Sequence, residues 1–146
     1  MGINHNELLS GKALVEMGNE VVYVSTDNKL VENMKHGYFH KDEKKIFDTI
    51  CQKSIEFTDD IKEALRTTNM CFISEDKTQD SSTLFNILSK AKKIGQYMTS
   101  HTFIVDRSPL PMNRTKQIIE TVQHELDKRS SNLTFEVISN PNFLRA

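Results

Sequence analysis

Several features that identify membrane, nucleic-acid-binding or metal proteins are scarce in this sequence of 146 residues. No apolar run approaches the roughly 18 residues that a membrane-spanning helix needs. The 19 basic and 20 acidic residues are spread along the chain, so nothing indicates a surface for nucleic acid. Cys51 and Cys71 lack the paired spacing of a zinc site or a redox motif. We therefore expect a protein with reduced thiols, located in the cytoplasm.

Metal-ligand patterns are also lacking. His36 and His40 are four residues apart, but Gly37 interrupts the helix between them and no third ligand is evident, which favours surface histidines. The pair His124-Glu125 lacks the second histidine of a metalloprotease motif and is typical of a solvated helix face. We expect no metal site in this chain.

The sequence does contain a clear turn, helix and strand between Gly2 and Asp27. Apolar residues recur at helical spacing and predict a helix near residues 6–17, and Gly18 is a natural left-handed end for it. These apolar residues are Leu9, Ala13, Leu14 and Met17. The layout is that of a phosphate-binding βαβ unit, in which a glycine turn at a helix N-terminus holds a pyrophosphate.

Strand and helix patterns alternate along the rest of the chain. Short β-favouring runs predict strands at 21–24, 55–57, 70–73, 103–105 and 135–138. Residues 25–28 predict the cap of a helix that runs to about Lys35 and is ended by Gly37. Helical periodicity and capping signals predict further helices at 61–66, about 82–98 and about 113–129. Residues 38–53 read as a loop and a charged helix, and Lys90, Lys92 and Lys93 read as the polar side of an amphipathic helix.

This alternation predicts the α/β class, with a Rossmann-like parallel sheet that carries helices on both faces. We expect one such domain over residues 1–146. A βαβ unit should begin with a strand before its glycine turn, yet only Met1 precedes Gly2, so the first strand is expected to be missing. Because that strand normally lies in the middle of the sheet, we expect unpaired strand edges, marginal stability or self-association.

Four segments together resemble a known family. They are Leu14-Val15-Glu16-Met17-Gly18-Asn19-Glu20-Val21, Phe57-Thr58-Asp59-Asp60-Ile61-Lys62-Glu63-Ala64, Val105-Asp106-Arg107-Ser108 and Ser139-Asn140-Pro141-Asn142-Phe143-Leu144-Arg145. In order and over nearly the whole chain, they resemble the N-terminal NAD-binding domain of the UDP-glucose/GDP-mannose dehydrogenases, and most nearly that of UDP-glucose 6-dehydrogenases. The resemblance implies an NAD cofactor and the NAD-dependent oxidation of a nucleotide sugar to the uronate.

Carried over residue by residue, the resemblance implies a degenerate cofactor site. The first glycine of the family's turn matches Gly2, but the other two match Asn4 and Glu7, where a side chain and a negative charge oppose pyrophosphate binding. The ribose-binding aspartate falls on Ser25, and Asp27 matches a second acidic position. NAD binding through these residues is expected to be weak or lost.

The later motifs of the family are altered as well. The family's Gly-Thr-Pro loop falls near 76–78 and is not preserved, and in its KSTVPVG segment Ser108 is retained whereas Pro109 replaces a threonine. The family's active-site glutamate corresponds to Asn142, whose amide cannot act as a base. The resemblance places the nucleophilic cysteine and most of the sugar-binding residues in later domains, beyond Ala146.

Three hypotheses follow. The first is an inactive, truncated NAD-binding domain, either a remnant or one fragment of a split gene. The second is a non-catalytic module that binds a protein partner. The third is an NAD-binding half completed in trans by a separate chain.

Overall fold

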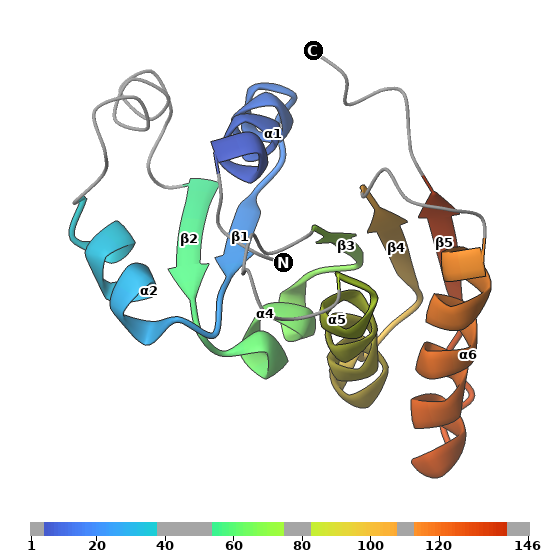
Figure 1. Ribbon diagram of the computed structural model, residues 1–146. Coiled ribbons are helices and arrows are strands. Elements are labelled where there is room, and N and C mark those ends of the chain that lie inside the picture. The colour runs from blue at the N-terminus through green and yellow to red at the C-terminus, as the bar shows by residue number, and fades with distance from the viewer. Residues whose placement is uncertain (1–4, 38–53, 75–82, 108–112, 140–146) are drawn as a thin grey trace. The chain divides into compact units, whose positions relative to one another are not determined.

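The computed structural model describes residues 5–37, 54–74, 83–107 and 113–139 (Figure 1). The chain divides into two compact units, residues 2–60 and residues 61–146, and each is described here by itself. Both units alternate helices with parallel strands, which confirms the predicted α/β, Rossmann-like class. No helix among these described residues is long and apolar enough to cross a membrane.

The first unit contains helices α1 (His5–Glu16) and α2 (Asn28–Lys35) and strands β1 (Val21–Val24) and β2 (Ile55–Thr58). The two strands pair in parallel, with Val21 opposite Ile55 and Val24 opposite Thr58. Both helices end before a glycine with positive φ, Gly18 at 94° and Gly37 at 76°. A left-handed glycine at this position is the usual helix stop, so the predicted helix ends are confirmed.

The core of the first unit is small. Its buried cluster consists of Leu8 from α1, Tyr23 from β1 and Met34 from α2, with partly buried apolar residues around it. The Tyr23 ring stacks on Phe57 of β2, with ring centroids 5.2 Å apart. One aromatic side chain thus joins both strands to the first helix.

Two of the apolar residues from which this helix was predicted, Leu9 and Met17, are not buried. Leu8 is completely buried and Gly11 lies against Tyr23, whereas the side chains of Leu9 and Met17 are 44% and 73% exposed. The reason is steric: a Cβ atom at Gly11 would lie 1.7 Å from the Tyr23 hydroxyl oxygen, so only a glycine face fits over this tyrosine. The remaining apolar stripe of the helix therefore faces outward.

The second unit contains helices α4 (Ile61–Thr67), α5 (Thr83–Tyr97) and α6 (Asn113–Lys128). Its strands are β3 (Met70–Ile73), β4 (Thr102–Asp106) and β5 (Phe135–Ser139), which form one parallel sheet in the order β3-β4-β5 (Figure 1). Its core cluster is much larger and joins helices α4, α5 and α6 to strands β3 and β4 through Leu65, Cys71, Ile73, Ile87, Ala91, Ile94, Met98, Ile104, Ile118, Val122 and Leu126.

Each unit contains its own parallel sheet, and the predicted absence of a first strand remains a prediction. Within the described residues β1 pairs only with β2, and β3 pairs only with β4, so each is an edge strand of its own sheet. The prediction of parallel strands is confirmed for all three strand pairs. The expectation of a single domain remains a prediction.

Candidate nucleotide-binding site

Ligands of open parallel sheets bind outside the carboxyl ends of the strands. In the first unit this edge carries Ser25 after β1 and Asp27 two residues later. The Ser25 amide donates to the Thr58 carbonyl oxygen at 3.1 Å, which continues the β1–β2 pairing past the last strand residue. The two candidate ribose-binding positions are therefore held on a defined backbone.

Asp27 acts mainly on its own helix. It is the N-cap of α2, and its Oδ1 atom accepts a hydrogen bond from the Leu30 amide at 3.1 Å. The Asp27 amide in turn donates to the Ser25 hydroxyl oxygen at 3.2 Å. An acidic N-cap accepts a hydrogen bond from a helix amide, and its negative charge interacts favourably with the positive end of the helix dipole. The carboxylate is thus used for capping, and the ribose-binding role predicted for Ser25 and Asp27 remains a prediction.

The first turn of α1 carries an acidic residue, Glu7, at the position where the resemblance predicts the family's third glycine. The Glu7 side chain is 8% exposed in the first turn, and its backbone carbonyl oxygen accepts a hydrogen bond from the Tyr23 hydroxyl at 3.0 Å. The same hydroxyl donates to the Leu8 carbonyl oxygen at 3.2 Å. Burial, and secondly the charge of Glu7, raises the pKa of the Tyr23 phenol, so this hydroxyl keeps its proton as a donor.

In the second unit, a buried ion pair closes the carboxyl end of β4. Arg114 in the first turn of α6 donates from Nε to Asp106 Oδ2 at 2.9 Å and from Nη2 to Asp106 Oδ1 at 3.2 Å. The two side chains are only 5% and 4% exposed. Such a bidentate pair fixes geometry because both hydrogen bonds must be satisfied together. It joins the end of β4 to the start of α6.

Two further polar contacts lie at the same ends of the strands. Lys90 of α5 donates from Nζ to the Ser74 carbonyl oxygen just after β3, at 2.6 Å. The Thr115 hydroxyl of α6 contacts the Ser139 hydroxyl at the end of β5. The sequence predicts that Lys90 belongs to the polar side of an amphipathic helix, and the structure adds the contact of its ammonium group with the end of β3. Helical periodicity could not reveal this, because the contact depends on where β3 ends.

Several predicted site residues fall outside the described part of the chain. These are Gly2, Asn4, Ser108 and Asn142, together with residues 76–78 and Pro109. Of the predicted cofactor-binding residues the structure places only Ser25 and Asp27, and it brings these two together. The roles assigned to the others remain predictions.

The remaining candidate groups behave as structural residues. His36 is the C-cap of α2, and its Nε2 atom lies 3.8 Å from Glu32 Oε2, while His40 lies outside the described residues. Glu125 is 5% exposed, so the prediction of a solvated face is wrong for this residue; its Oε1 atom lies 3.4 Å from Lys128 Nζ. The cysteine and metal candidates give no reactive site in the described residues. Burial raises the pKa of the Cys71 thiol to about 11, which makes it a poor nucleophile. The described residues hold no group of three metal-ligating side chains.

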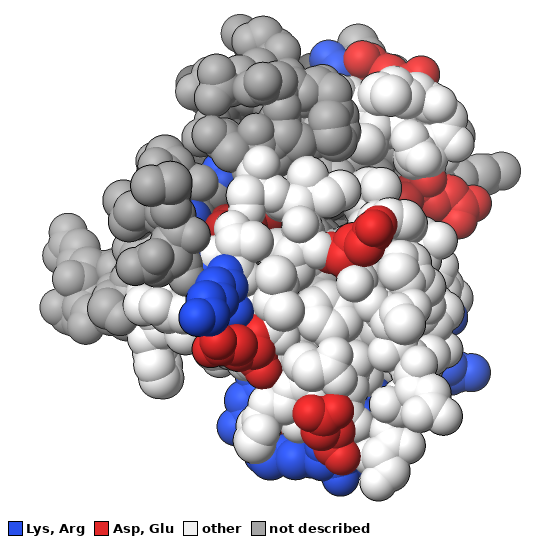
Figure 2. All heavy atoms as spheres, turned by 90° about the vertical axis from the view of Figure 1, so that its right-hand side faces the viewer, with Lys and Arg blue, Asp and Glu red and all other residues white. Residues whose placement is uncertain are grey.

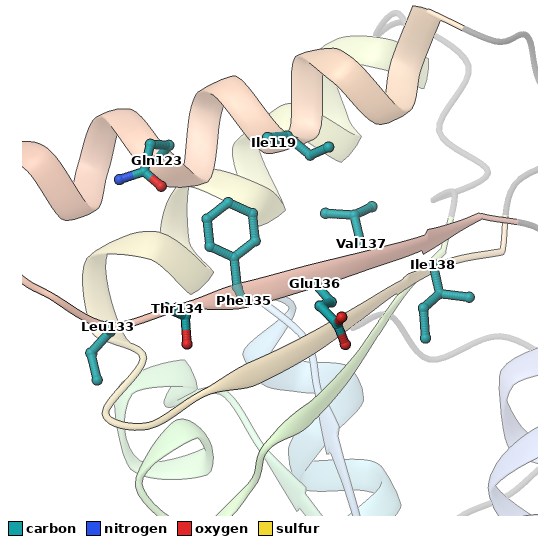
Figure 3. A pocket seen from close by; sticks show the side chains of 8 residues that line it. All are labelled: Ile119, Gln123, Leu133, Thr134, Phe135, Glu136, Val137 and Ile138. Carbon is teal, nitrogen blue, oxygen red and sulfur yellow. The ribbon is translucent and has the colours of Figure 1, made fainter.

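A groove of about 510 Å³ lies along β5, but its lining does not suit a dinucleotide. Phe135 and Val137 point from the strand toward Ile119 and Gln123 of α6 (Figure 3). Glu136 is the only charged residue in the lining, and a carboxylate repels phosphate. On the face drawn in Figure 2, the described basic side chains lie in small groups among acidic ones.

Comparison with known proteins supports the resemblance. The family model for the NAD-binding domain of the UDP-glucose/GDP-mannose dehydrogenase family matches residues 2–146. The chain belongs to this family. It is 29% identical to UDP-glucose 6-dehydrogenase TuaD of Bacillus subtilis and 25% identical to a UDP-glucose 6-dehydrogenase of Pseudomonas aeruginosa. These alignments cover 99% of this chain but only 32% and 34% of those proteins, so the chain spans about a third of their length.

The fold has a relative among solved structures. The crystal structure of a ternary complex of GDP-mannose dehydrogenase from Pseudomonas aeruginosa matches with a TM-score of 0.77 at 18% sequence identity. The match covers 99% of this chain and 35% of that one. At this identity the likeness establishes the Rossmann-like fold, in agreement with the family model.

Proposed function

We propose that residues 1–146 form an NAD-binding-type domain with weak affinity for NAD, and that by themselves they do not oxidise a nucleotide sugar. The observation that carries this proposal is the use of Asp27 as the N-cap of α2, next to Ser25, the residue that the resemblance aligns with the ribose-binding acid. No charge-assisted hydrogen bond to ribose is then expected from Ser25, a loss of roughly one to two decades in affinity. We expect this domain to act in the cytoplasm.

The start of α1 supports the same proposal. A pyrophosphate needs close approach of backbone amides and a locally positive field. Glu7 places a carboxylate within the first turn of that helix, where its charge opposes a bound phosphate. We expect no turnover, because the resemblance aligns Asn142 with the family's catalytic glutamate.

Calorimetric titration with NAD tests the proposal directly. We expect no saturation at micromolar NAD for the natural sequence, and measurable binding for the triple variant Asn4→Gly, Glu7→Gly, Ser25→Asp. The matched control replaces Ser25→Asp by Ser25→Asn in the same background, because asparagine has the shape of aspartate without its charge. The control should bind more weakly than the aspartate variant. Micromolar binding by the unmodified chain would contradict the proposal.

A second candidate function is an NAD-binding half completed by another chain. The match of residues 2–146 to the family's NAD-binding domain supports it, because that domain supplies the cofactor-binding part of such an enzyme. The test is to add NAD and UDP-glucose to the chain with and without a separately expressed C-terminal part of a relative. NADH formation that requires both chains would favour this candidate over the inactive domain.

A further inference from the structure

Strand β5 leaves one edge of its sheet open within the described residues, since it pairs only with β4. Thr102 of β4 lies opposite Phe135, and the Thr102 amide donates to the Thr134 carbonyl oxygen at 3.3 Å. Along a parallel strand, the backbone groups of successive residues face opposite neighbours. The even-numbered residues of β5 therefore face β4, and the backbone groups of Phe135 and Val137 face the open edge.

The groove between α6 and β5 runs along this open edge. Its lining includes every residue from Leu133 to Ile138. Because successive side chains of a strand point to opposite faces, a hollow lined by consecutive residues lies beside the strand rather than on one face of the sheet. Ile119 and Gln123 of α6 form the other wall (Figure 3). The groove thus lies where a further strand would add to the sheet.

The two faces of β5 differ along this edge. Phe135 and Val137 point toward α6, where Ile119 is 42% exposed (Figure 3). Glu136 points to the opposite face, is exposed, and is the only charged residue in the lining. A strand laid along the edge would therefore meet apolar side chains on the face of α6 and a carboxylate on the other face.

We propose that the open edge of β5 binds an extended segment of another protein, in which two apolar residues flank a lysine or an arginine. The segment adds one strand to the sheet, so that its backbone groups pair with those of Phe135 and Val137. Its apolar side chains pack between these residues and Ile119, and its basic side chain lies beside Glu136 on the opposite face. In such strand addition the backbone supplies affinity and the alternate side chains supply specificity.

Charge disfavours a second copy of β5 as the occupant. If two copies of this edge pair about a two-fold axis, only odd-numbered residues can hydrogen-bond to each other, because the even-numbered ones face β4. Even-numbered residues then lie opposite even-numbered ones. In the registers with the largest overlap, the two Glu136 carboxylates lie directly opposite or two residues apart on the same face. Like charges in such pairs destabilise a sheet, whereas a basic residue beside Glu136 stabilises it.

The expected binding is weak. Strand β5 has five residues and is about 16 Å long, so the contact lies at the small end of specific interfaces. We expect dissociation constants of roughly 0.1 to 1 mM for a short peptide. The probe is a labelled peptide of the sequence Ser-Val-Lys-Val-Ser with blocked ends. The matched control peptide has glutamate in place of lysine.

The first experiment locates the peptide by amide hydrogen exchange, measured for single residues of the full chain by NMR. The lysine peptide should slow the exchange of the Phe135 and Val137 amides, because these donors face the open edge. The amides of Glu136 and Ile138 face β4 and should change much less. Unchanged exchange at Phe135 and Val137 in several millimolar peptide overturns the proposal.

The second experiment tests the charge pairing by fluorescence anisotropy. The natural chain should bind the lysine peptide roughly 2 to 5 times more tightly than the glutamate peptide, and Glu136→Lys should reverse this preference. The control Glu63→Lys makes the same change of charge at an exposed position of α4, which does not line the groove, and should leave the preference unchanged. A preference that both variants reverse equally would reflect net charge alone and would overturn the proposal.

The third experiment tests the strand geometry with N-methylated lysine peptides. Every second amide of an added strand faces β5, so methylation of one alternate set should abolish binding and methylation of the other set should leave it intact. Equal losses from both sets would mean that the peptide is not bound as a strand.

Discussion

The two units of this chain use the same strand pattern but differ in how much they bury. Residues 61–146 pack three helices against β3 and β4 through one extended apolar cluster and add the buried ion pair between Asp106 and Arg114. In the described part of residues 2–60 the buried cluster contains only Leu8, Tyr23 and Met34. The smaller core belongs to the unit that carries Ser25 and Asp27. The comparison teaches that the fold is held mainly by the part of the chain without these cofactor positions.

The largest expected effect concerns the ion pair of the second unit. Asp106→Asn leaves the Arg114 charge buried without a counter-charge, which should cost about 3–5 kcal/mol of unfolding free energy in urea titrations. The control is Arg66→Gln, which breaks a pair of similar length, 3.0 Å from Nη1 to Glu63 Oε2, at an exposed position. Such surface pairs contribute little, so this variant should lose less than about 1 kcal/mol. Equal losses would show that burial of the pair does not matter.

A matched leucine truncation in each unit tests the difference between the cores. Leu126→Ala and Leu8→Ala both remove a side chain with 0% exposure, and such truncations cost about 2–5 kcal/mol. We expect Leu126→Ala near the upper end of this range, because the larger cluster loses more contacts. Leu8→Ala should fall near the lower end and should speed hydrogen exchange only in residues 5–58. Accelerated exchange in residues 61–139 after Leu8→Ala would contradict the independence of the two cores.

A glycine in each unit offers a third test. A Cβ at Gly95 would lie 3.0 Å from the Val122 carbonyl oxygen, which is backbone of α6, whereas a Cβ at Gly11 meets only the Tyr23 side chain. Both alanine variants should lose about 1–3 kcal/mol through overpacking. Tyr23→Leu should partly restore Gly11→Ala, because it removes the obstructing hydroxyl. No such side-chain change is expected to rescue Gly95→Ala, and thermal unfolding of the single and double variants measures both outcomes.

The smallest effect lies in the helix cap of the first unit. Asp27→Ala should lower stability by about 1 kcal/mol because the Leu30 amide loses its acceptor. Asp27→Asn keeps an acceptor oxygen at the same place, so its loss of stability should be only a few tenths of the loss expected for Asp27→Ala. Hydrogen exchange of residues 28–31 reports the change locally. An asparagine variant as unstable as the alanine one would mean that charge, rather than the hydrogen bond, holds this helix end.

The fold could be predicted well because its signals are local. The four apolar residues Val21–Val24 and the four residues Met70–Ile73 are strands with the bounds that the sequence indicated. Gly18 and Gly37 end their helices for a backbone reason that the residue type alone reveals. Local propensity and turn chemistry agree with the tertiary structure at these positions.

The candidate site could be predicted only in part, because its contacts join distant elements. The Asp106–Arg114 pair crosses from the end of β4 to the start of α6, and no helical or strand period connects these positions. The buried side of α1 was equally hidden, since it depends on the Tyr23 hydroxyl occupying the space over Gly11. The capping residues 25–28 indicated the start of α2, and the structure identifies Asp27 as its N-cap.

A single side chain at the end of α6 restricts changes in the lengths of helices α5 and α6. Arg129 donates from Nη1 to the carbonyl oxygens of Gly95, Gln96 and Met98, so one guanidinium serves three backbone acceptors at the end of α5. One inserted residue within either helix would turn everything beyond it by about 100°. The insertion would either move the Arg129 guanidinium away from its three acceptors or move Gly95 of α5 away from Val122 of α6, against which it packs. The lengths of α5 and α6 are therefore coupled, and natural or engineered insertions in one helix would require a compensating change in the other.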